Sequence, residues 1–247
     1  MNATFYGAQK PESFARWRAA TPDGFVFAVK AARATTHRKE PADIEAAVGR
    51  FLGSGITELA EKLGPILWQF PPTRKFDAGA LEAFLALLPK AQDGVPLRHV
   101  VEARHPSFSD PAYVALLRRF GVAHALIDSD KQALLADQTA DFVYARLQRS
   151  QETEAEGYPP AALDRWADRF RAWSSGPRGR GPAAGRRYGI GRSGGAGLLR
   201  LLYQRRQSAR AGGRDGDART PPGLSRSRLS EIGTGKARAL PWTHQRP

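Results

Sequence analysis

The chain has 247 residues, which is room for one domain of α/β-barrel size or for two small domains. It contains no cysteine, and this excludes disulfides, thiolate metal ligands and cysteine nucleophiles. No apolar run approaches the ~20 residues of a membrane span, and the amino terminus lacks the basic-then-apolar pattern of a secretion signal. We therefore expect a cytoplasmic protein.

The positive charge is confined to the last third of the chain. The formal net charge is +14, a value typical of proteins that bind nucleic acid or an anionic surface. Residues 1–174 hold 22 basic and 21 acidic side chains, a net +1, whereas residues 175–247 hold 16 basic and 3 acidic side chains, a net +13. The charge therefore says nothing about partners of the first 174 residues.

Between residues 25 and 147, short apolar runs alternate with longer segments of helical period. Near-continuous apolar runs are typical of strands covered on both faces, as in parallel sheets. The expected strands are 25–30, 65–70, 99–104, 122–128 and 142–147. The expected helices are one that begins at Pro11, one over 42–62, one from the N-cap Asp77 to Pro89, one from Asp110 to Gly121, and one that carries Leu163, Trp166, Phe170 and Trp173 on one face.

Strands that alternate with helices predict an α/β protein with a parallel sheet, either open or closed into a barrel. No glycine-rich phosphate-binding loop follows any of the expected strands, which disfavours the nucleotide-binding forms of the open sheet.

Four stretches in a fixed order connect the chain to a known family. They are NATFYGAQKPESFARWRAATPDGFVFAVKAARATTHRK, LGPILWQFPP, RHVVEARHPSF and DFVYARL. Together they cover nearly all of residues 2–173 and resemble the YecE-like family, also called domain of unknown function 72. The resemblance implies a (β/α)₈ barrel of TIM type, and it implies no established activity. Fold and function are separate questions here.

The resemblance also implies that both ends depart from the family. The family's first strand, first helix and most of its second strand would precede the position of Asn2, so we expect an incomplete barrel over residues 1–174. After Trp173 the helical and strand periodicity stops, and 15 of the 25 glycines lie in 175–247.

Two interpretations of residues 175–247 compete. One is a basic disordered tail that binds nucleic acid. The other is an out-of-frame translation: codons that can encode 199–211, read one nucleotide later, give FVYFINGAKVRA, which resembles the family's eighth strand. The second interpretation is favoured, and it includes the case of a chain without function. We expect at most six parallel strands and little packing from residues beyond about 175.

Polar side chains at the ends of the expected strands are the candidates for chemistry, because strand ends converge on one face of a β/α barrel. Glu102, His105 and Asp128 are the candidate acid/base residues, and Lys30, Gln69, Arg104 and Arg146 are the candidate ligand-binding residues. Glu102 and Arg104 project to the same side of a strand, where they form either a catalytic base beside an anion clamp or a structural ion pair. We expect at least four of Lys30, Glu102, Arg104, His105 and Arg146 to surround one cavity.

Further alternatives concern histidines, aspartates and metals. His37 either reaches this mouth or lies in a solvated loop, whereas His124 is expected in the core. Asp128 and Asp130 either pair with a cation of this mouth or cap a turn. No metal set is predicted, although a divalent ion held by Glu102, His105 and Asp128 stays open; cofactors and oligomeric state are unknown.

The three arginine and lysine candidates favour a small anionic molecule, such as a phosphate or a carboxylate, as ligand. Acid/base or hydrolytic chemistry on that molecule is one hypothesis. A non-enzymatic nucleic-acid binder that uses residues 175–247 is the alternative, and the sequence does not decide whether the chain is an enzyme.

Overall fold

The computed structural model describes residues 1–130, 135–175 and 200–203. These residues form two compact units. The first comprises residues 1–125 and 135–141, and the second comprises 126–130, 142–175 and 200–203. In the described residues no helix is long and apolar enough to cross a membrane.

The first unit alternates helices with parallel strands. Its helices are α1 (Ala3–Tyr6), α2 (Pro11–Ala19), α3 (Ala34–His37), α4 (Pro41–Leu52), α5 (Ala78–Ala86) and α6 (Pro111–Phe120), with the 3₁₀ helices η1 (Ile56–Lys62) and η2 (Pro106–Phe108). Its main strands are β1 (Phe27–Lys30), β2 (Leu63–Gln69), β5 (His99–Glu102) and the first half of β6 (Ala123–Asp128). A separate hairpin is formed by β3 (Ala91–Gln92) and β4 (Val95–Pro96).

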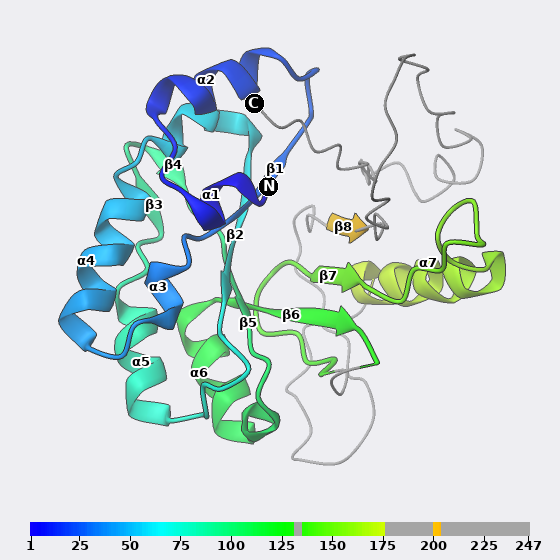
Figure 1. Ribbon diagram of the computed structural model, residues 1–247. Coiled ribbons are helices and arrows are strands. Elements are labelled where there is room, and N and C mark those ends of the chain that lie inside the picture. The colour runs from blue at the N-terminus through cyan, green and yellow to red at the C-terminus, as the bar shows by residue number, and fades with distance from the viewer. Residues whose placement is uncertain (131–134, 176–199, 204–247) are drawn as a thin grey trace, which may run out of the picture. The chain divides into compact units, whose positions relative to one another are not determined.

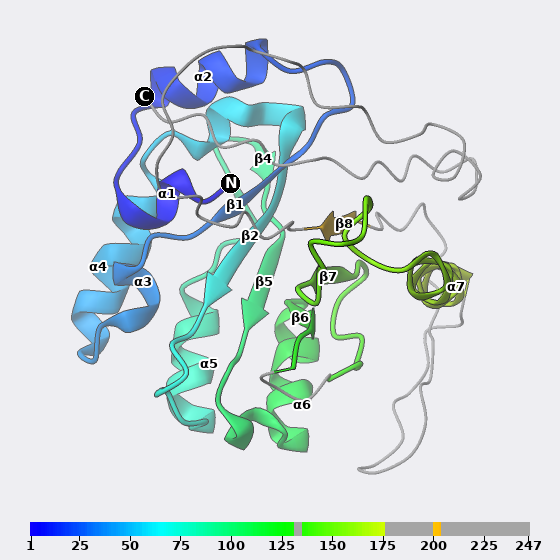
Figure 2. The same cartoon turned by 45° about the vertical axis from the view of Figure 1, so that its right-hand side comes forward.

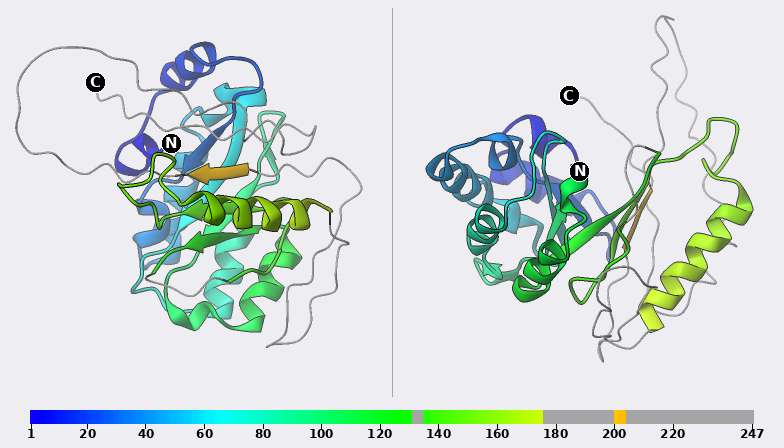
Figure 3. Two further views of the ribbon diagram at one scale, coloured as in Figure 1. Left: turned by 90° about the vertical axis from the view of Figure 1, so that its right-hand side faces the viewer. Right: turned by 90° about the horizontal axis from the view of Figure 1, so that it is seen from below.

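The sheet of the first unit has the order β1-β2-β5-β6, with every neighbouring pair parallel. Figure 2 shows β2 and β5 side by side with their arrowheads at the same end. Helices α4, α5 and α6 lie along one side of these strands (Figures 1 and 3). The predicted parallel α/β sheet is confirmed, whereas closure into a barrel lies outside what the described residues show.

The helix-covered face of the sheet holds an aromatic core. The Trp68 ring of β2 packs edge-on against Phe51 of α4 and Phe84 of α5, with ring centroids 5.6 and 5.7 Å apart. All three side chains are buried. Full burial of side chains of this size contributes ~2–3 kcal/mol each, so this contact fixes the helices on the sheet.

Successive residues of a strand point to opposite faces, so the neighbours of Trp68 face away from the helices. Strand register aligns Lys30 with Leu67 and Gln69 with Glu102. Aligned residues of parallel strands share a face, and Lys30, Gln69 and Glu102 therefore lie on the face opposite Trp68, at the carboxyl ends of β1, β2 and β5.

Helix ends follow the local sequence signals. Asp77 accepts a hydrogen bond from the Ala80 amide at 2.7 Å, and Asp110 accepts one from Ala112 at 2.8 Å, so both act as N-caps. Gly121 ends α6 in the left-handed conformation with φ 68°. The predicted N-cap at Asp77, the helix start at Asp110 and the helix end at Gly121 are confirmed.

The single helix predicted over 42–62 is wrong. Helix α4 ends at Leu52, and η1 begins at Ile56 after Gly55, whose φ is 91°. An added Cβ at Gly55 would lie 2.7 Å from the Pro11 side chain. The close approach of α2 therefore needs glycine at this turn, and periodicity alone does not reveal that contact.

The second unit contains the end of β6, β7 (Tyr144–Leu147), α7 (Pro160–Ser175) and β8 (Arg200–Tyr203). The buried side chains of Trp166, Phe170 and Trp173 share one face of α7, as predicted. Strands β7 and β8 pair in parallel from Tyr144↔Arg200 onward.

Strand β8 pairs four residues beyond position 175 with β7, and the strand order then holds six strands, the expected maximum. The apolar run LLRLLY at 198–203 contains this strand, and apolar residues favour strand formation even within a polar segment. The remaining residues of the proposed tail, 176–199 and 204–247, lie outside the described residues, and both the boundary at 174/175 and the frameshift stay predictions.

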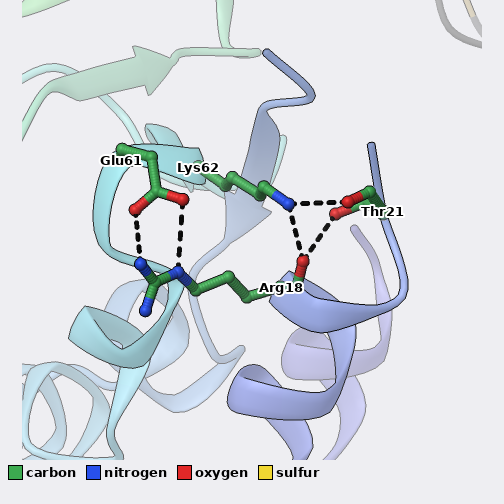
Figure 4. Close-up of polar contacts among 4 residues, drawn as sticks. All are labelled: Arg18, Thr21, Glu61 and Lys62. Carbon is green, nitrogen blue, oxygen red and sulfur yellow. Dashed lines mark hydrogen bonds and ion pairs between the residues drawn. The ribbon is translucent and has the colours of Figure 1, made fainter. Parts of the chain in front are cut away.

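A buried lysine joins α2 to η1 at the amino-terminal end of β2. Figure 4 shows the Lys62 ammonium donating to the main-chain oxygens of Arg18, at 2.7 Å, and Thr21, at 2.6 Å. Beside it the Arg18 guanidinium binds both carboxylate oxygens of Glu61, at 3.2 and 2.8 Å. The lysine is 6% exposed, and its charge is satisfied by carbonyl dipoles instead of by a carboxylate.

We predict that Lys62→Met destabilises the protein by ~1–3 kcal/mol, because two carbonyl oxygens lose a charged donor. Urea unfolding measures the change in the free energy of unfolding. The matched control is Lys39→Met at an exposed lysine, which should leave the stability nearly unchanged. Equal stability of the two variants would contradict the anchoring role of Lys62.

Candidate functional site

The centre of the site is a buried carboxylate. Glu102, the last residue of β5, is 1% exposed. Its Oε1 accepts hydrogen bonds from Gln69 Nε2 at 2.6 Å and from Arg104 Nε at 2.8 Å. The predicted pairing of Glu102 with Arg104 is confirmed, and Gln69 joins the same carboxylate from the neighbouring strand. Burial of a carboxylate without hydrogen-bond donors would be strongly unfavourable, and the two donors to Glu102 offset part of that cost.

Helices α1 and α3 hold the ends of β1 and β2. Thr36 Oγ1 donates to the Gln69 carbonyl oxygen at 2.7 Å, and Thr4 Oγ1 donates to the Lys30 carbonyl oxygen at 2.6 Å. The Lys30 ammonium lies 3.6 Å from the centroid of the Phe5 ring, a cation–π contact. Lys30 is thus held on an aromatic surface at the carboxyl end of the sheet.

His37 lies among three cations. Burial lowers the pKa of His37, and the nearby charges of Arg33, Lys30 and Arg104 lower it further, against a hydrogen bond with the Arg33 backbone that raises it. Lys30, His37 and Arg104 are therefore close enough to interact electrostatically. The structure brings together Lys30, Gln69, Glu102 and Arg104 of the predicted set, and it adds His37.

His105 is used differently. Its Nδ1 accepts a hydrogen bond from the Ser107 amide at 3.1 Å and lies 2.8 Å from Ser107 Oγ, so the side chain caps η2. His105 follows Arg104 directly in the chain. Its Nδ1, however, is occupied by the cap of η2. Its proposed role as an acid or base stays a prediction.

The remaining predicted residues, Asp128 and Arg146, belong to the second unit. Asp128 accepts a hydrogen bond from Tyr158 Oη at 2.9 Å, and its carboxylate lies 3.3 Å from Arg149 Nε. Arg149 Nε is also 2.9 Å from Asp130 Oδ1. Asp128 and Asp130 therefore both pair with Arg149, which is not one of the cations predicted at the mouth, and their pairing with a mouth cation stays a prediction. Arg146 lies on β7, and its convergence with the first unit stays a prediction.

Within residues 1–130, 135–175 and 200–203, no group of three or more His, Asp or Glu side chains is placed to hold a metal ion. The divalent-ion alternative combines Glu102 and His105 of the first unit with Asp128 of the second unit, and it stays a prediction.

His124 is a core residue, as predicted. It is 6% exposed, and its Nδ1 lies 2.8 Å from the Tyr113 hydroxyl. Its amide donates to Thr139 Oγ1 at 2.8 Å. Burial lowers the pKa of His124 to about 4, although the negative charge of Glu102 acts in the opposite direction. The imidazole is therefore neutral in the folded protein at pH 7.

The low pKa of His124 predicts a loss of stability in mild acid. The unfolded chain binds a proton near pH 6.5, whereas the folded chain resists it down to pH about 4. The stabilisation is complete above pH 6.5 and is lost as the pH falls through this window, by an amount of about 3 kcal/mol. Urea unfolding between pH 4 and 7 should therefore show a shallower pH dependence for His124→Gln than for the unmodified chain. A slope that is the same in both proteins contradicts the prediction, and His105→Gln is the matched control.

Sequence reasoning missed Thr36 and Phe5. Thr36 is 2% exposed and bridges α3 to β2, and Phe5 supports Lys30. The sequence does carry a signal for Thr36. It stands in ATTH, a few residues after the end of the expected strand 25–30, and its hydroxyl is next in the chain to the imidazole of His37. No signal near Phe5 connects it to Lys30, because that contact joins residues 25 positions apart in the chain.

These features define an α/β protein with a polar cluster at the carboxyl ends of its parallel strands. The chain belongs to the family described as protein of unknown function DUF72, whose model matches residues 1–184. A comparison with curated proteins finds no match.

Solved structures of the same family are similar to this chain. Two crystal structures of a DUF72 family protein from Enterococcus faecalis V583 align with TM-scores of 0.50 and 0.53, at 20% and 16% identity. Each alignment covers 69% of this chain, with 65% and 75% of the bacterial protein. In the first alignment the chain thus spans slightly less than two thirds of its relative. At these identities the likeness shows the fold alone.

Proposed function

We propose that the cluster formed by Lys30, Gln69, Glu102 and Arg104 binds a small anionic molecule, such as a phosphate or a carboxylate. The observation that carries the proposal is the state of Arg104. Its Nε donates to Glu102, while its terminal Nη groups have no hydrogen-bond partner in the described part of the chain. Its side chain is 35% exposed.

A guanidinium oriented in this way suits an oxyanion. The Nη groups form a planar fork that matches a carboxylate or a phosphate, and the bond from Nε to the buried Glu102 fixes the direction of that fork. Less side-chain freedom is then lost when a ligand binds, which favours affinity.

The surrounding charge supports the same ligand class. Arg33, Lys30 and Arg104 all act on His37, against the one buried carboxylate of Glu102. The balance at this end of the sheet is positive, and an anion is attracted to it. A purely structural ion pair between Glu102 and Arg104 is the alternative, and it predicts no ligand.

The test is a calorimetric titration of the full-length chain with inorganic phosphate and with small mono- and dicarboxylates. We predict that Arg104→Gln weakens binding by about tenfold or more, equivalent to ~1.4 kcal/mol, because the fork is lost. Arg16→Gln, at an exposed arginine of α2 outside the site, is the matched control and should bind like the unmodified chain. Absence of binding to any of these anions, or equal affinity of the two variants, would overturn the proposal.

A further inference from the structure

A short chain of hydrogen bonds sets the tautomer of His37. Thr36 Oγ1 lies 2.7 Å from the Gln69 carbonyl oxygen and 3.0 Å from His37 Nδ1. A hydroxyl has one proton to donate, and a carbonyl oxygen can only accept. The proton of Thr36 therefore goes to Gln69, and Thr36 Oγ1 accepts from His37. The imidazole must carry its proton on Nδ1.

The other ring nitrogen of His37 is then a base. In the neutral Nδ1–H tautomer the lone pair is on Nε2. In the described residues the ring has two hydrogen-bond partners, Thr36 Oγ1 and the Arg33 backbone. Both accept, so a neutral ring offers them its single Nδ1 proton and keeps the Nε2 lone pair. The side chain is partly exposed. The ring also packs edge-on against Phe5 with centroids 6.1 Å apart, which limits its rotation.

Two other histidines have the opposite arrangement. His105 Nδ1 accepts from the Ser107 amide, and His99 Nδ1 accepts from the Trp68 indole N–H at 3.1 Å. Amide and indole nitrogens are donors only, so the lone pair of each neutral ring is already used. Among His37, His99 and His105, only His37 keeps a ring lone pair that no donor of the described residues occupies.

The charges that face His37 come from three elements. Arg33 is at the start of α3, Lys30 ends β1, and Arg104 follows β5. These cations and partial burial lower the pKa of His37, which keeps the imidazole unprotonated at neutral pH. The same cations would attract an anionic molecule to the unprotonated nitrogen, and Phe5 supplies only an uncharged ring from α1.

We infer that His37 is the general base of this site and removes a proton from the anionic molecule that Arg104 binds. The proton comes from a hydroxyl group, or from a carbon beside a carbonyl group, of that molecule. The O–H or C–H bond breaks, the proton forms a new bond to Nε2, and the electron pair stays on the substrate atom. Lys30 and Arg104 stabilise the resulting negative charge. This inference rests on the proposed function, since the base needs a bound anion.

The first test measures the tautomer in the full-length chain labelled with ¹⁵N-histidine. Two-bond proton–nitrogen correlation spectra at pH 7.5 should show a protonated Nδ1 and an unprotonated Nε2 for His37. His99 and His105 should show the reverse, and they serve as internal controls. Thr36→Ala should weaken the Nδ1–H preference, because only the Arg33 backbone then accepts from the ring, and Thr36→Ser, which keeps the hydroxyl, should restore it. A proton on Nε2 of His37 in the unmodified chain overturns the inference, whatever anions bind.

The second test measures access and ligand contact through diethyl pyrocarbonate, a reagent that attacks unprotonated imidazole nitrogens. We expect modification of His37, mapped by mass spectrometry, to be blocked by inorganic phosphate in the unmodified chain and in Arg16→Gln. That protection should be lost in Arg104→Gln. Calorimetric binding of phosphate without protection of His37 overturns the inference and leaves anion binding intact. If the tautomer is as expected but phosphate neither binds nor protects His37, both the inference and the proposed function are overturned.

Discussion

The site depends on the burial of one carboxylate. A charge that is removed from water is tolerated only when donors replace the lost hydration, and Glu102 has two such donors on a single oxygen. Gln69 reaches it because β2 and β5 pair in the register that aligns the two residues, and Arg104 reaches it from two positions beyond the end of β5. A change in that register would leave Glu102 without Gln69. Strand pairing and the orientation of Arg104 are therefore coupled.

Hydrogen-bond partners assign different roles to chemically identical histidines. His99 accepts from Trp68 and donates to the Pro89 carbonyl oxygen, so it links β5 to the loop after α5. His105 caps η2, and His124 is buried beside Tyr113. His37 differs because its partner, Thr36, has already given its proton to the main chain. The donor and acceptor capacity of the neighbour, more than the exposure of the ring, decides which nitrogen is available.

Both ends of the parallel strands are held by polar groups, but in different ways. At the amino-terminal end of β2, the Lys62 ammonium donates to two main-chain oxygens, and Arg18 binds both carboxylate oxygens of Glu61 (Figure 4). At the carboxyl end, Arg104 uses one nitrogen for Glu102 and keeps its terminal groups for solvent. Donors held between protein groups stabilise the fold, whereas a guanidinium that is oriented through Nε and has both terminal nitrogens unbonded within the described residues is suited to a ligand. This contrast explains why only the carboxyl end is a candidate site.

The sequence by itself determined the parallel α/β class, the positions of five strands and the caps at Asp77, Asp110 and Gly121, because hydrophobic period and capping chemistry are local properties. It also indicated the pairing of Glu102, the last residue of β5, with Arg104, which follows two residues later. It could have indicated the β3–β4 hairpin as well, since Asp93-Gly94 is a typical turn pair, and both residues have positive φ. Only the tertiary structure decided the break before η1, the contact of Lys30 with Phe5 and the bridge from His37 through Thr36 to Gln69. Each of these joins segments that are distant in the chain, and the proximity of distant segments is set by packing and strand register, which no local pattern encodes.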